Sequence, residues 1–247
     1  MGRAVLLASL CVLNSCRTTP PARSDLTVAA AANLTNVFQT IGAEFEKQTA
    51  IHPVFSFAST AQLTQQIENS APFDVLTAAD AGHVDQLERE GLLVPGTRAV
   101  YATGILAMWI PPSSHAKVTR IEDLTSPDVR VIAVANPELA PYGHATIETL
   151  DHAGILAQVK PKIVYAENIN MAKQYGISNN ADAVFTAYSL VLREQGTVVP
   201  VDEKLHQPIQ QELGIIAKSK HLDAARKFVQ FLMTGNGRSI LLKSGYR

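Results

Sequence analysis

The feature that most constrains this fold is a regular alternation of short β-rich runs with amphipathic helical runs, which begins at Leu26. This alternation is typical of α/β architecture, in which mainly parallel strands are joined by helices that cover the sheet. Residues 26–31 predict the first strand, and apolar residues at helical spacing from Leu34 to Phe45 predict the first helix. Further strands are predicted at residues 51–57, 74–77, 100–110, 131–134, 163–165, 183–185, 198–201 and 214–217.

The order of these elements predicts two α/β lobes. The 247 residues suffice for two lobes of modest size. Crossings between the lobes are expected near residues 98–103 and 200–204, so the first lobe is discontinuous. Residues 25–100 and 201–247 are assigned to lobe I, and residues 101–200 to lobe II. Each lobe is expected to hold a mainly parallel sheet flanked by helices, with a ligand cleft between the lobes.

The N-terminus carries the pattern of an export signal. A basic Arg3 precedes an apolar run over residues 4–13, which is too short to span a bilayer but suits a signal peptide. The following LNSC, which ends at Cys16, resembles the bacterial lipoprotein box, in which cleavage leaves an acylated cysteine. We therefore predict a signal peptide at residues 1–16, a Pro-rich tether at 17–24, and a periplasmic or cell-envelope protein anchored at Cys16. The alternative is an ordinary secretory signal with an unused cysteine.

The overall charge and the cysteine positions exclude several classes of protein. The formal net charge is −1 at pH 7, so no basic field attracts nucleic acid. Both cysteines, Cys11 and Cys16, lie in the first 16 residues, so the remainder holds neither a disulfide framework nor a Cys-based metal site. An anion bound by such a chain must be held by local hydrogen-bond donors.

Four junctions between a predicted strand and a predicted helix carry the functional interpretation, and two of them lie in lobe I. In the first, a run of alanines up to Ala32 leads into a helix that Asn33 is expected to cap. In the second, Ser59 or Thr60 can cap the next helix while its hydroxyl or amide faces the cleft. Backbone N–H groups at helix starts lack intrahelical partners, so they suit an anion, and small residues let it approach the main chain.

The other two junctions fall in lobe II. Residues 136–143 form a loop fixed by two prolines, in which Gly143 permits a close turn and the Tyr142 hydroxyl can donate to a ligand. A helix that begins near Ile169 can offer a bare N–H. Taken singly, a polar residue at a helix start is most often a plain N-cap. Two junctions in each lobe favour a binding site, formed by Ala32, Asn33, Ser59, Thr60, Tyr142 and Ile169.

Four stretches of this sequence resemble the molybdate-binding periplasmic proteins, which have the type II periplasmic-binding fold. They are VAAAANLTNVF from residue 28, VFSFASTAQLTQQIENSAPFDVLTAAD from 54, NPELAPYGHATIETL from 136 and GIIAKSKHLDAARKFVQFL from 214. The second is the most specific, since it joins a Ser-rich turn to a QI-x-x-x-A-P-x-D-V segment. The resemblance covers nearly all residues from 26 to 246. It implies a monomeric receptor that passes molybdate or tungstate to the permease of an ABC transporter.

The resemblance also implies that the oxyanion contacts Asn33, Ser59, Tyr142 and Ile169, with no separate cofactor. This sequence departs from many members of the family, since Asn33 and Tyr142 stand where many have Ser and Ala. Thr186 falls near a cleft tyrosine of some members, and Tyr142 can replace the hydroxyl that is lost there. Molybdate suits a pocket of donors alone, because its four oxygens accept hydrogen bonds and it has no proton to give. Sulfate or another tetrahedral oxyanion is the alternative ligand, because only cavity size separates sulfate from molybdate.

An enzyme is not expected. An exported hydrolase is the alternative to a binding protein. Ser114 and Lys117 match an S-x-x-K spacing but have no KTG or SDN partner. His144 can be read as a base, and Asp74 with Asp80 as a carboxylate pair, yet loop and capping roles explain these residues more simply. No set of nucleophile, base and orienting group can be assembled. The sequence also lacks H-E-x-x-H and the Gly-rich nucleotide motifs.

The lipoprotein box generates the first testable prediction. Cys16→Ser should move the protein from the membrane fraction to the soluble fraction, because it removes the sulfur that would be acylated. Fractionation of cells that express each form, followed by immunoblotting, measures this. A wild-type protein that is already soluble after export would show that the cysteine is not lipidated.

Overall fold

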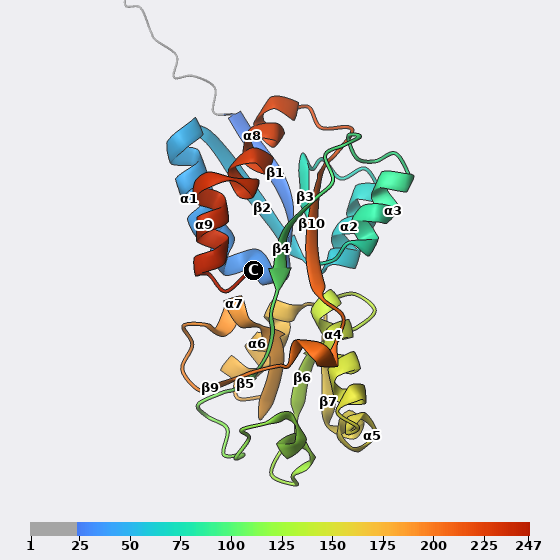
Figure 1. Cartoon of the computed structure of the whole chain (residues 1–247), viewed down its shortest axis with the longest axis vertical. Helices are drawn as coiled ribbons and strands as arrows, with labels where there is room; N and C mark the ends of the chain where they lie inside the picture. Colours follow the sequence, from blue (N-terminus) through green and yellow to red (C-terminus); the bar gives the residue numbers. More distant parts are fainter. Residues whose placement is uncertain (1–23) are drawn as a thin grey trace, which may run out of the picture.

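In a computed structural model, which describes residues 24–247, the chain forms two lobes joined at the middle (Figure 1). The predicted signal peptide, Cys16 and the tether up to residue 23 lie outside the described residues. Among the residues that are described, no helix is both long and apolar enough to cross a membrane. Each lobe contains one five-stranded sheet with helices packed on it.

The sheet of lobe I has the strand order β2-β1-β3-β10-β4. β1 pairs in parallel with β2 and β3, whereas β10 is antiparallel to both β3 and β4. Four of the five strands therefore run in the same direction, as the predicted mainly parallel sheet requires. The strands are β1 (Ser24–Ala31), β2 (Ile51–Ala58), β3 (Val75–Thr77), β4 (Ala99–Gly104) and β10 (Ile209–Ile215).

The sheet of lobe II repeats this arrangement with the order β7-β6-β8-β5-β9. β6 pairs in parallel with β7 and β8, and β5 is antiparallel to β8 and β9. Both sheets thus place one antiparallel strand between a parallel group and an edge strand. The strands are β5 (Leu106–Ile110), β6 (Ile132–Ala135), β7 (Ile163–Ala166), β8 (Ala183–Ala187) and β9 (Thr197–Pro200).

Helices cover both faces of the lobe I sheet (Figure 1). On one face lie α1 (Thr35–Thr49), α8 (Leu222–Met233) and α9 (Gly235–Lys243). Their contact with the sheet is built around Phe38, Phe45 and Phe228, whose rings meet at centroid distances of 5.2–6.0 Å. On the other face, α2 (Thr60–Glu68) and α3 (Gly82–Arg89) bury a separate apolar cluster that includes Leu63 and Leu87.

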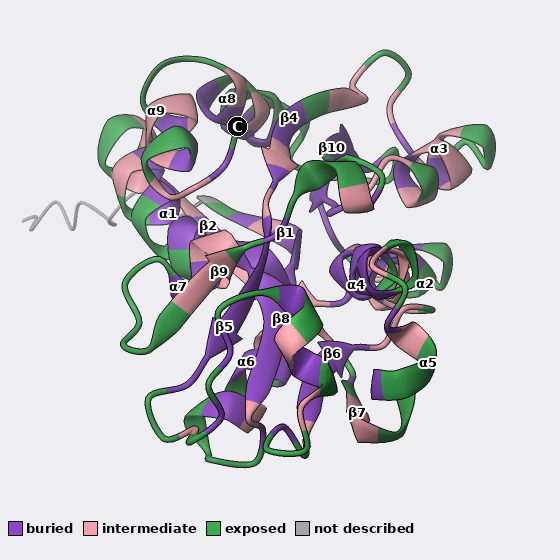
Figure 2. Ribbon diagram, turned by 60° about the horizontal axis from the view of Figure 1, so that its bottom comes forward, coloured by how far each residue is buried: buried purple, intermediate pink, exposed green. Residues whose placement is uncertain are grey.

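The helices of lobe II lie on both faces of its sheet. They are α4 (Pro141–His152), α5 (Leu156–Val159), α6 (Ile169–Ile177) and α7 (Tyr188–Val191). Four short 3₁₀ segments complete the fold: η1 (Ala32–Leu34), η2 (Ile121–Thr125), η3 (Lys160–Lys162) and η4 (Glu203–Leu205). Buried residues concentrate in the strands of both lobes, whereas exposed residues lie on the outer helix faces and loops (Figure 2).

Two segments connect the lobes, and the first corrects a sequence prediction. Residues 100–110 were expected to form one strand, but the chain forms β4 in lobe I and β5 in lobe II, divided at Ile105. β5 is buried throughout and β4 in part, and the mostly apolar sequence continues from one strand into the other, so it does not mark the crossing. The expected boundary at residue 100 falls inside β4. The second connection runs from β9 to β10 through η4.

The last strand also differs from its prediction. We expected it at residues 214–217, but β10 covers Ile209–Ile215 and lies between β3 and the edge strand β4 of the lobe I sheet. The polar run Gln210-Gln211-Glu212 does not look like a buried strand. Gln211 and Glu212 are nevertheless buried, because both side chains have hydrogen-bonding or charged partners.

The two lobes touch each other along the cleft. The amide of Ala61 in lobe I donates to the carbonyl of Leu139 in lobe II at 3.2 Å. Beside it, Gln62 of α2 hydrogen-bonds Glu167 of lobe II. The structure therefore represents the closed arrangement of the lobes, in which the residues at the cleft are brought together.

Candidate anion-binding site

Four helix starts meet between the lobes. They belong to η1 and α2 of lobe I and to α4 and α6 of lobe II. All six residues predicted for the site line one small void there, together with Ala31, Ala79, Ala140, Pro141 and Asn168. The void measures about 10 Å³, which by this measure is room for about one water-sized group.

Small and rigid residues allow the main chain to surround this void. Ala31 and Ala32 end β1 and begin η1 without a side chain that could fill it. Pro141 is the first residue of α4. Proline is tolerated there because an N–H at this position would have no acceptor within the helix. A Cβ at Gly143 would lie 2.1 Å from the carbonyl oxygen of Ala135, so only glycine lets α4 begin this close to the end of β6.

Backbone amides form the most reliable donors of the site. Thr60 and Ile169 are the first residues of α2 and α6, and Tyr142 is the second residue of α4, so their N–H groups lie outside the intrahelical ladder. Asn168 caps α6 by accepting from the amides of Asn170 and Met171, at 3.1 and 3.0 Å, and this leaves the Ile169 amide for a ligand. The helix dipoles add partial positive charge at the same points.

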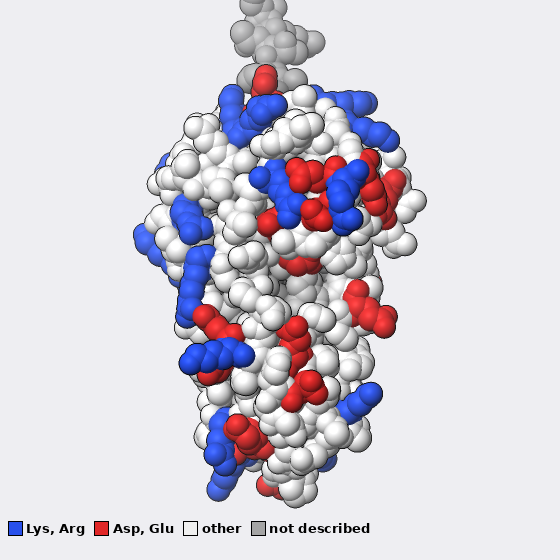
Figure 3. Space-filling view, turned by 45° about the vertical axis from the view of Figure 1, so that its right-hand side comes forward, with Lys and Arg blue, Asp and Glu red and all other residues white. Residues whose placement is uncertain are grey.

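No ionised side chain lines the void within the described part of the chain. The outer surface seen in Figure 3 likewise shows acidic and basic side chains interspersed rather than one basic face. An anion in the site would therefore be held by oriented dipoles and hydroxyls. This is the arrangement that the near-zero net charge required.

Asn33 does not cap a helix, which corrects the sequence interpretation. The helix α1 begins at Thr35, after the η1 turn, and has no side-chain cap. The Asn33 side chain turns away from the helix and donates to Gln211 Oε1 at 3.0 Å and to Tyr246 Oη at 3.1 Å. Both of its N–H groups are thus used inside the protein, so Asn33 can offer an anion its backbone but not its side-chain amide.

The neighbouring Ser59 and Thr60 have different roles. Ser59 is the N-cap of α2, and Gln62 Oε1 lies 3.1 Å from its amide and 2.6 Å from its hydroxyl. Thr60 Oγ1 accepts from the Ala79 amide at 3.1 Å, which leaves the hydroxyl proton of Thr60 free to donate to a ligand. Between the two hydroxyls, that of Thr60 is the better-placed donor in this arrangement.

Three buried tyrosines surround the base of the site. Burial raises the pKa of Tyr101, Tyr142 and Tyr246, so each hydroxyl keeps its proton well above neutral pH and can donate. Tyr142 Oη accepts a hydrogen bond from Gln211 Nε2 at 3.0 Å. Thr186 is fully buried in β8 but does not line the void, and its hydroxyl has no partner among the described residues.

Sequence reasoning missed Gln211, Tyr246 and Gly104. Gln211 lies in the polar run that disguised β10, and Tyr246 follows the last helix, far along the chain from Asn33. Gly104 ends β4, and a Cβ there would lie 2.2 Å from Tyr142 Oη and 2.5 Å from Gln211 Nε2. The available signal for Gln211 was that Ile209, Leu213 and Ile215 recur with a period of two, which places Gln211 on the same face of a strand as these apolar residues.

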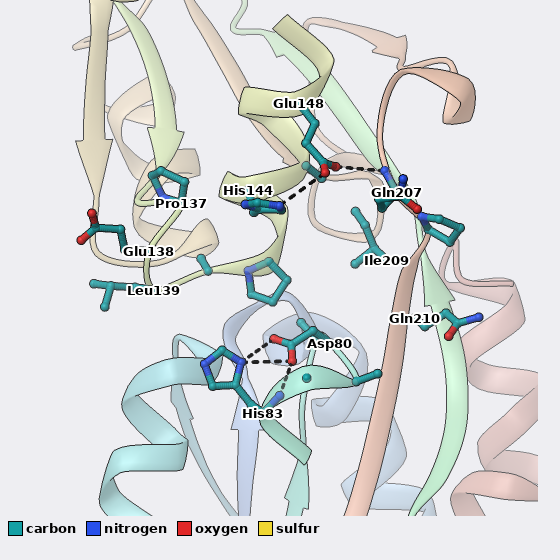
Figure 4. A pocket seen from close by; sticks show the side chains of 17 residues that line it. Asp80, His83, Pro137, Glu138, Leu139, His144, Glu148, Gln207, Ile209 and Gln210 are labelled. Atoms are coloured by element: carbon teal, nitrogen blue, oxygen red, sulfur yellow. Dashed lines mark hydrogen bonds and ion pairs between the residues drawn. The ribbon is translucent and has the colours of Figure 1, made fainter. Parts of the chain in front are cut away.

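A larger cavity of about 410 Å³ adjoins the site and shares Ala79, Ala140 and Pro141 with it (Figure 4). Its polar side chains include Asp80 with His83 from lobe I and His144 with Glu148 from lobe II. Asp80 caps the start of α3 by accepting from the His83 amide at 2.8 Å, and its hydrogen bond to the ring raises the pKa of His83. The carboxylates make this cavity unsuitable for an oxyanion.

Asp74 and Asp80, the possible catalytic carboxylate pair of the sequence, have structural roles instead. Asp80 caps α3, and Asp74 accepts from the Thr27 amide at 2.8 Å and from the Ser219 hydroxyl at 2.7 Å. His144 lies mostly exposed on α4, and its Nε2 is 3.4 Å from Oε1 of Glu148.

A two-lobed α/β protein with a small, donor-lined site between its lobes is a solute-binding protein. The family model described as bacterial extracellular solute-binding protein matches residues 26–247, and the chain belongs to that family.

Its relatives are named for one ligand. The chain is 33% identical to the molybdate-binding protein ModA of Rhodobacter capsulatus, over 92% of this chain and 90% of that protein. It is 34% identical to the ModA of Azotobacter vinelandii, over 90% of each. The solved structure of the A. vinelandii periplasmic molybdate-binding protein superposes with a TM-score of 0.86 and 28% identity, covering 90% of this chain and 98% of that one. These relatives are binding proteins, in agreement with the prediction that the chain is not an enzyme.

The close approach at Gly104 gives a prediction for stability. Gly104→Ala should lower the free energy of unfolding by about 1–3 kcal/mol, because the new methyl group overlaps the Tyr142 hydroxyl and the Gln211 amide. Urea unfolding measures the change. Gly82→Ala is the matched control, since its nearest new contact is Asp80 Oδ1 at 3.7 Å, and it should be nearly neutral. Equal midpoints for both variants would contradict the constraint at Gly104.

Proposed function

We propose that this chain is an extracytoplasmic receptor that captures molybdate, or the similar tungstate, and delivers it to the membrane permease of an ABC transporter. The observation that carries the proposal is the void of about 10 Å³ between the lobes, lined by four helix starts and by no ionised side chain. The names of the relatives supply the particular oxyanion.

The donor set matches the chemistry of a proton-free tetrahedral dianion. Molybdate presents only acceptors, and the donors that we assign to it are the amides of Thr60, Tyr142 and Ile169 with the hydroxyls of Thr60 and Tyr142. Ala32 and the backbone of Asn33 complete the lining on the lobe I side. Protonated phosphate would leave its O–H without an acceptor, at a cost of about 1–3 kcal/mol.

Closure of the lobes explains how so small a site can be filled. The donors of α2 belong to lobe I and those of α4 and α6 to lobe II, so an anion completes its hydrogen bonds only when the lobes meet. Hinge closure about two connecting segments is a common way to enclose a ligand. The closed shape then provides the surface that a permease can distinguish from the empty receptor.

Attachment to the membrane at Cys16 is part of the proposal. A receptor tethered near its permease meets it at a higher effective concentration than a free one. A relative from Bacillus subtilis, 26% identical over 98% of this chain and 94% of that protein, is named a putative ABC transporter substrate-binding lipoprotein. The receptor is expected to act as a monomer, since one chain supplies all four helix starts.

Calorimetric titration tests the ligand. The purified protein should bind molybdate and tungstate. Sulfate should bind more weakly, because its sulfur–oxygen bonds are shorter than the metal–oxygen bonds of molybdate, and phosphate should bind least. The sulfate-binding protein SubI of Mycobacterium tuberculosis has the same fold, with a TM-score of 0.77 at 14% identity, so fold alone does not choose the anion. Tighter binding of sulfate than of molybdate would replace the proposed ligand, and binding of neither would refute an oxyanion receptor.

Tyr142 should contribute more to affinity than Thr186. Tyr142→Phe should weaken molybdate binding roughly 10- to 150-fold, because a hydrogen bond to a charged acceptor contributes about 1.5–3 kcal/mol. The ring remains, so the protein should still fold. Thr186→Val should weaken molybdate binding less, since Thr186 does not line the void. Near-wild-type affinity for the first variant together with a large loss for the second would overturn this assignment of the lobe II donor.

A further inference from the structure

A buried chain of hydrogen bonds runs beneath the site from one side of lobe II to the other. It begins at Ser189 in α7, passes through Tyr246, Asn33 and Gln211 of lobe I, and ends at Tyr142 in α4. Its three central members and Tyr142 are all at least 97% buried. Because water does not reach these groups, each donor must find a partner within the chain or in a bound ligand.

The direction of these hydrogen bonds is fixed from the Asn33 end. Tyr246 Oη donates to the carbonyl oxygen of Asn33 at 2.8 Å, so it can only accept from the Asn33 side chain. Asn33 then gives its second N–H to Gln211 Oε1. Tyr101 Oη lies 2.8 Å from the same oxygen and 3.0 Å from the carbonyl oxygen of Ala78, so its one proton is shared between these two acceptors.

The orientation of the Gln211 amide follows from this. Its oxygen faces the donors on Asn33 and Tyr101, so its nitrogen must face Tyr142, and it donates to Tyr142 Oη at 3.0 Å. A hydroxyl that accepts in this bond has its own proton left over. Tyr142 is among the residues that line the anion void, and in the proposed function this remaining proton is the one that it gives to the anion.

We propose that Gln211 is a positioning residue of the anion site, whose amide holds the Tyr142 hydroxyl as an acceptor and thereby directs its proton to the oxyanion. This inference rests on the proposed function, in which Tyr142 donates to the bound anion. Gln211 lies in lobe I and Tyr142 in lobe II, so this hydrogen bond joins the two lobes beside the crossing at Gly104.

The contact is held tightly enough to have this effect. Gly104, at the crossing between the lobes, leaves no space behind either group, since a Cβ there would lie within 2.5 Å of both Tyr142 Oη and Gln211 Nε2. The Tyr142 ring is 1% exposed, and Gln211 is 0% exposed.

Gln211→Glu reverses the polarity of this contact while it keeps the shape of the side chain. The variant carboxylate can accept from Asn33, Tyr101 and Tyr142 together, so it draws the Tyr142 proton away from the anion. Above the pKa of that carboxyl, molybdate affinity should fall at least about 10-fold. As the pH is lowered and the carboxyl is protonated, its O–H can donate to Tyr142 as the amide did, so affinity should recover.

The measurements are molybdate titrations over the pH range in which the anion stays unprotonated. The molybdate affinity of the wild-type protein should change little over this pH range. Gln211→Met serves as the control without charge or hydrogen bonds, and its affinity should not depend on pH. Urea unfolding of each variant without ligand shows whether it is folded under the conditions of the titration.

A double-mutant cycle separates positioning from simple repulsion between two negative charges. In the Tyr142→Phe background no hydroxyl proton can be withdrawn, so the loss caused by Gln211→Glu should be smaller by about 5-fold or more. Equal losses in both backgrounds would show repulsion alone and overturn the positioning role. Failure of the wild type to bind any oxyanion would instead refute the proposed function, so the two failures are distinguishable.

Discussion

The site depends on one constraint: the first amides of a helix have no carbonyl within that helix to bond. Four helix starts bring such amides to a single void, and no ionised residue of the described chain lines it. Oriented dipoles must therefore supply all the stabilisation that an anion loses when it leaves water. Because the helix starts come from both lobes, the proposed binding of an anion is coupled to lobe closure.

The buried polar network gives these donors their orientation. Asn33, Gln211 and Tyr246 use their hydrogen-bonding groups on one another and do not reach the ligand with their side chains. Their effect is to decide which protons remain unused at the void. In a low-dielectric interior such an arrangement is costly to alter, because every change leaves a buried group without a partner.

Local patterns made most of the fold predictable. The alternation of strands and helices, the mainly parallel sheets and the six residues around the void follow from periodicity and from polar or small residues at helix starts. The errors concern the bounds of two strands, at residues 100–110 and 209–215, where the sequence does not show the usual change between apolar and polar residues. The run 100–110 is apolar on both sides of the crossing at Ile105, and the polar Gln211 is buried in a central strand. Neither position can be interpreted from its neighbours in sequence alone.

The sequence by itself determined the class of site, because helix starts and small residues act over a few positions of the chain. The tertiary structure decided which hydrogens are free there. Asn33 meets Gln211 and Tyr246 across separations of 178 and 213 residues, and these contacts convert an expected helix cap into a part of the supporting network. A hydrogen bond has one donor and one acceptor, so the role of each polar group depends on partners that only the folded chain brings together.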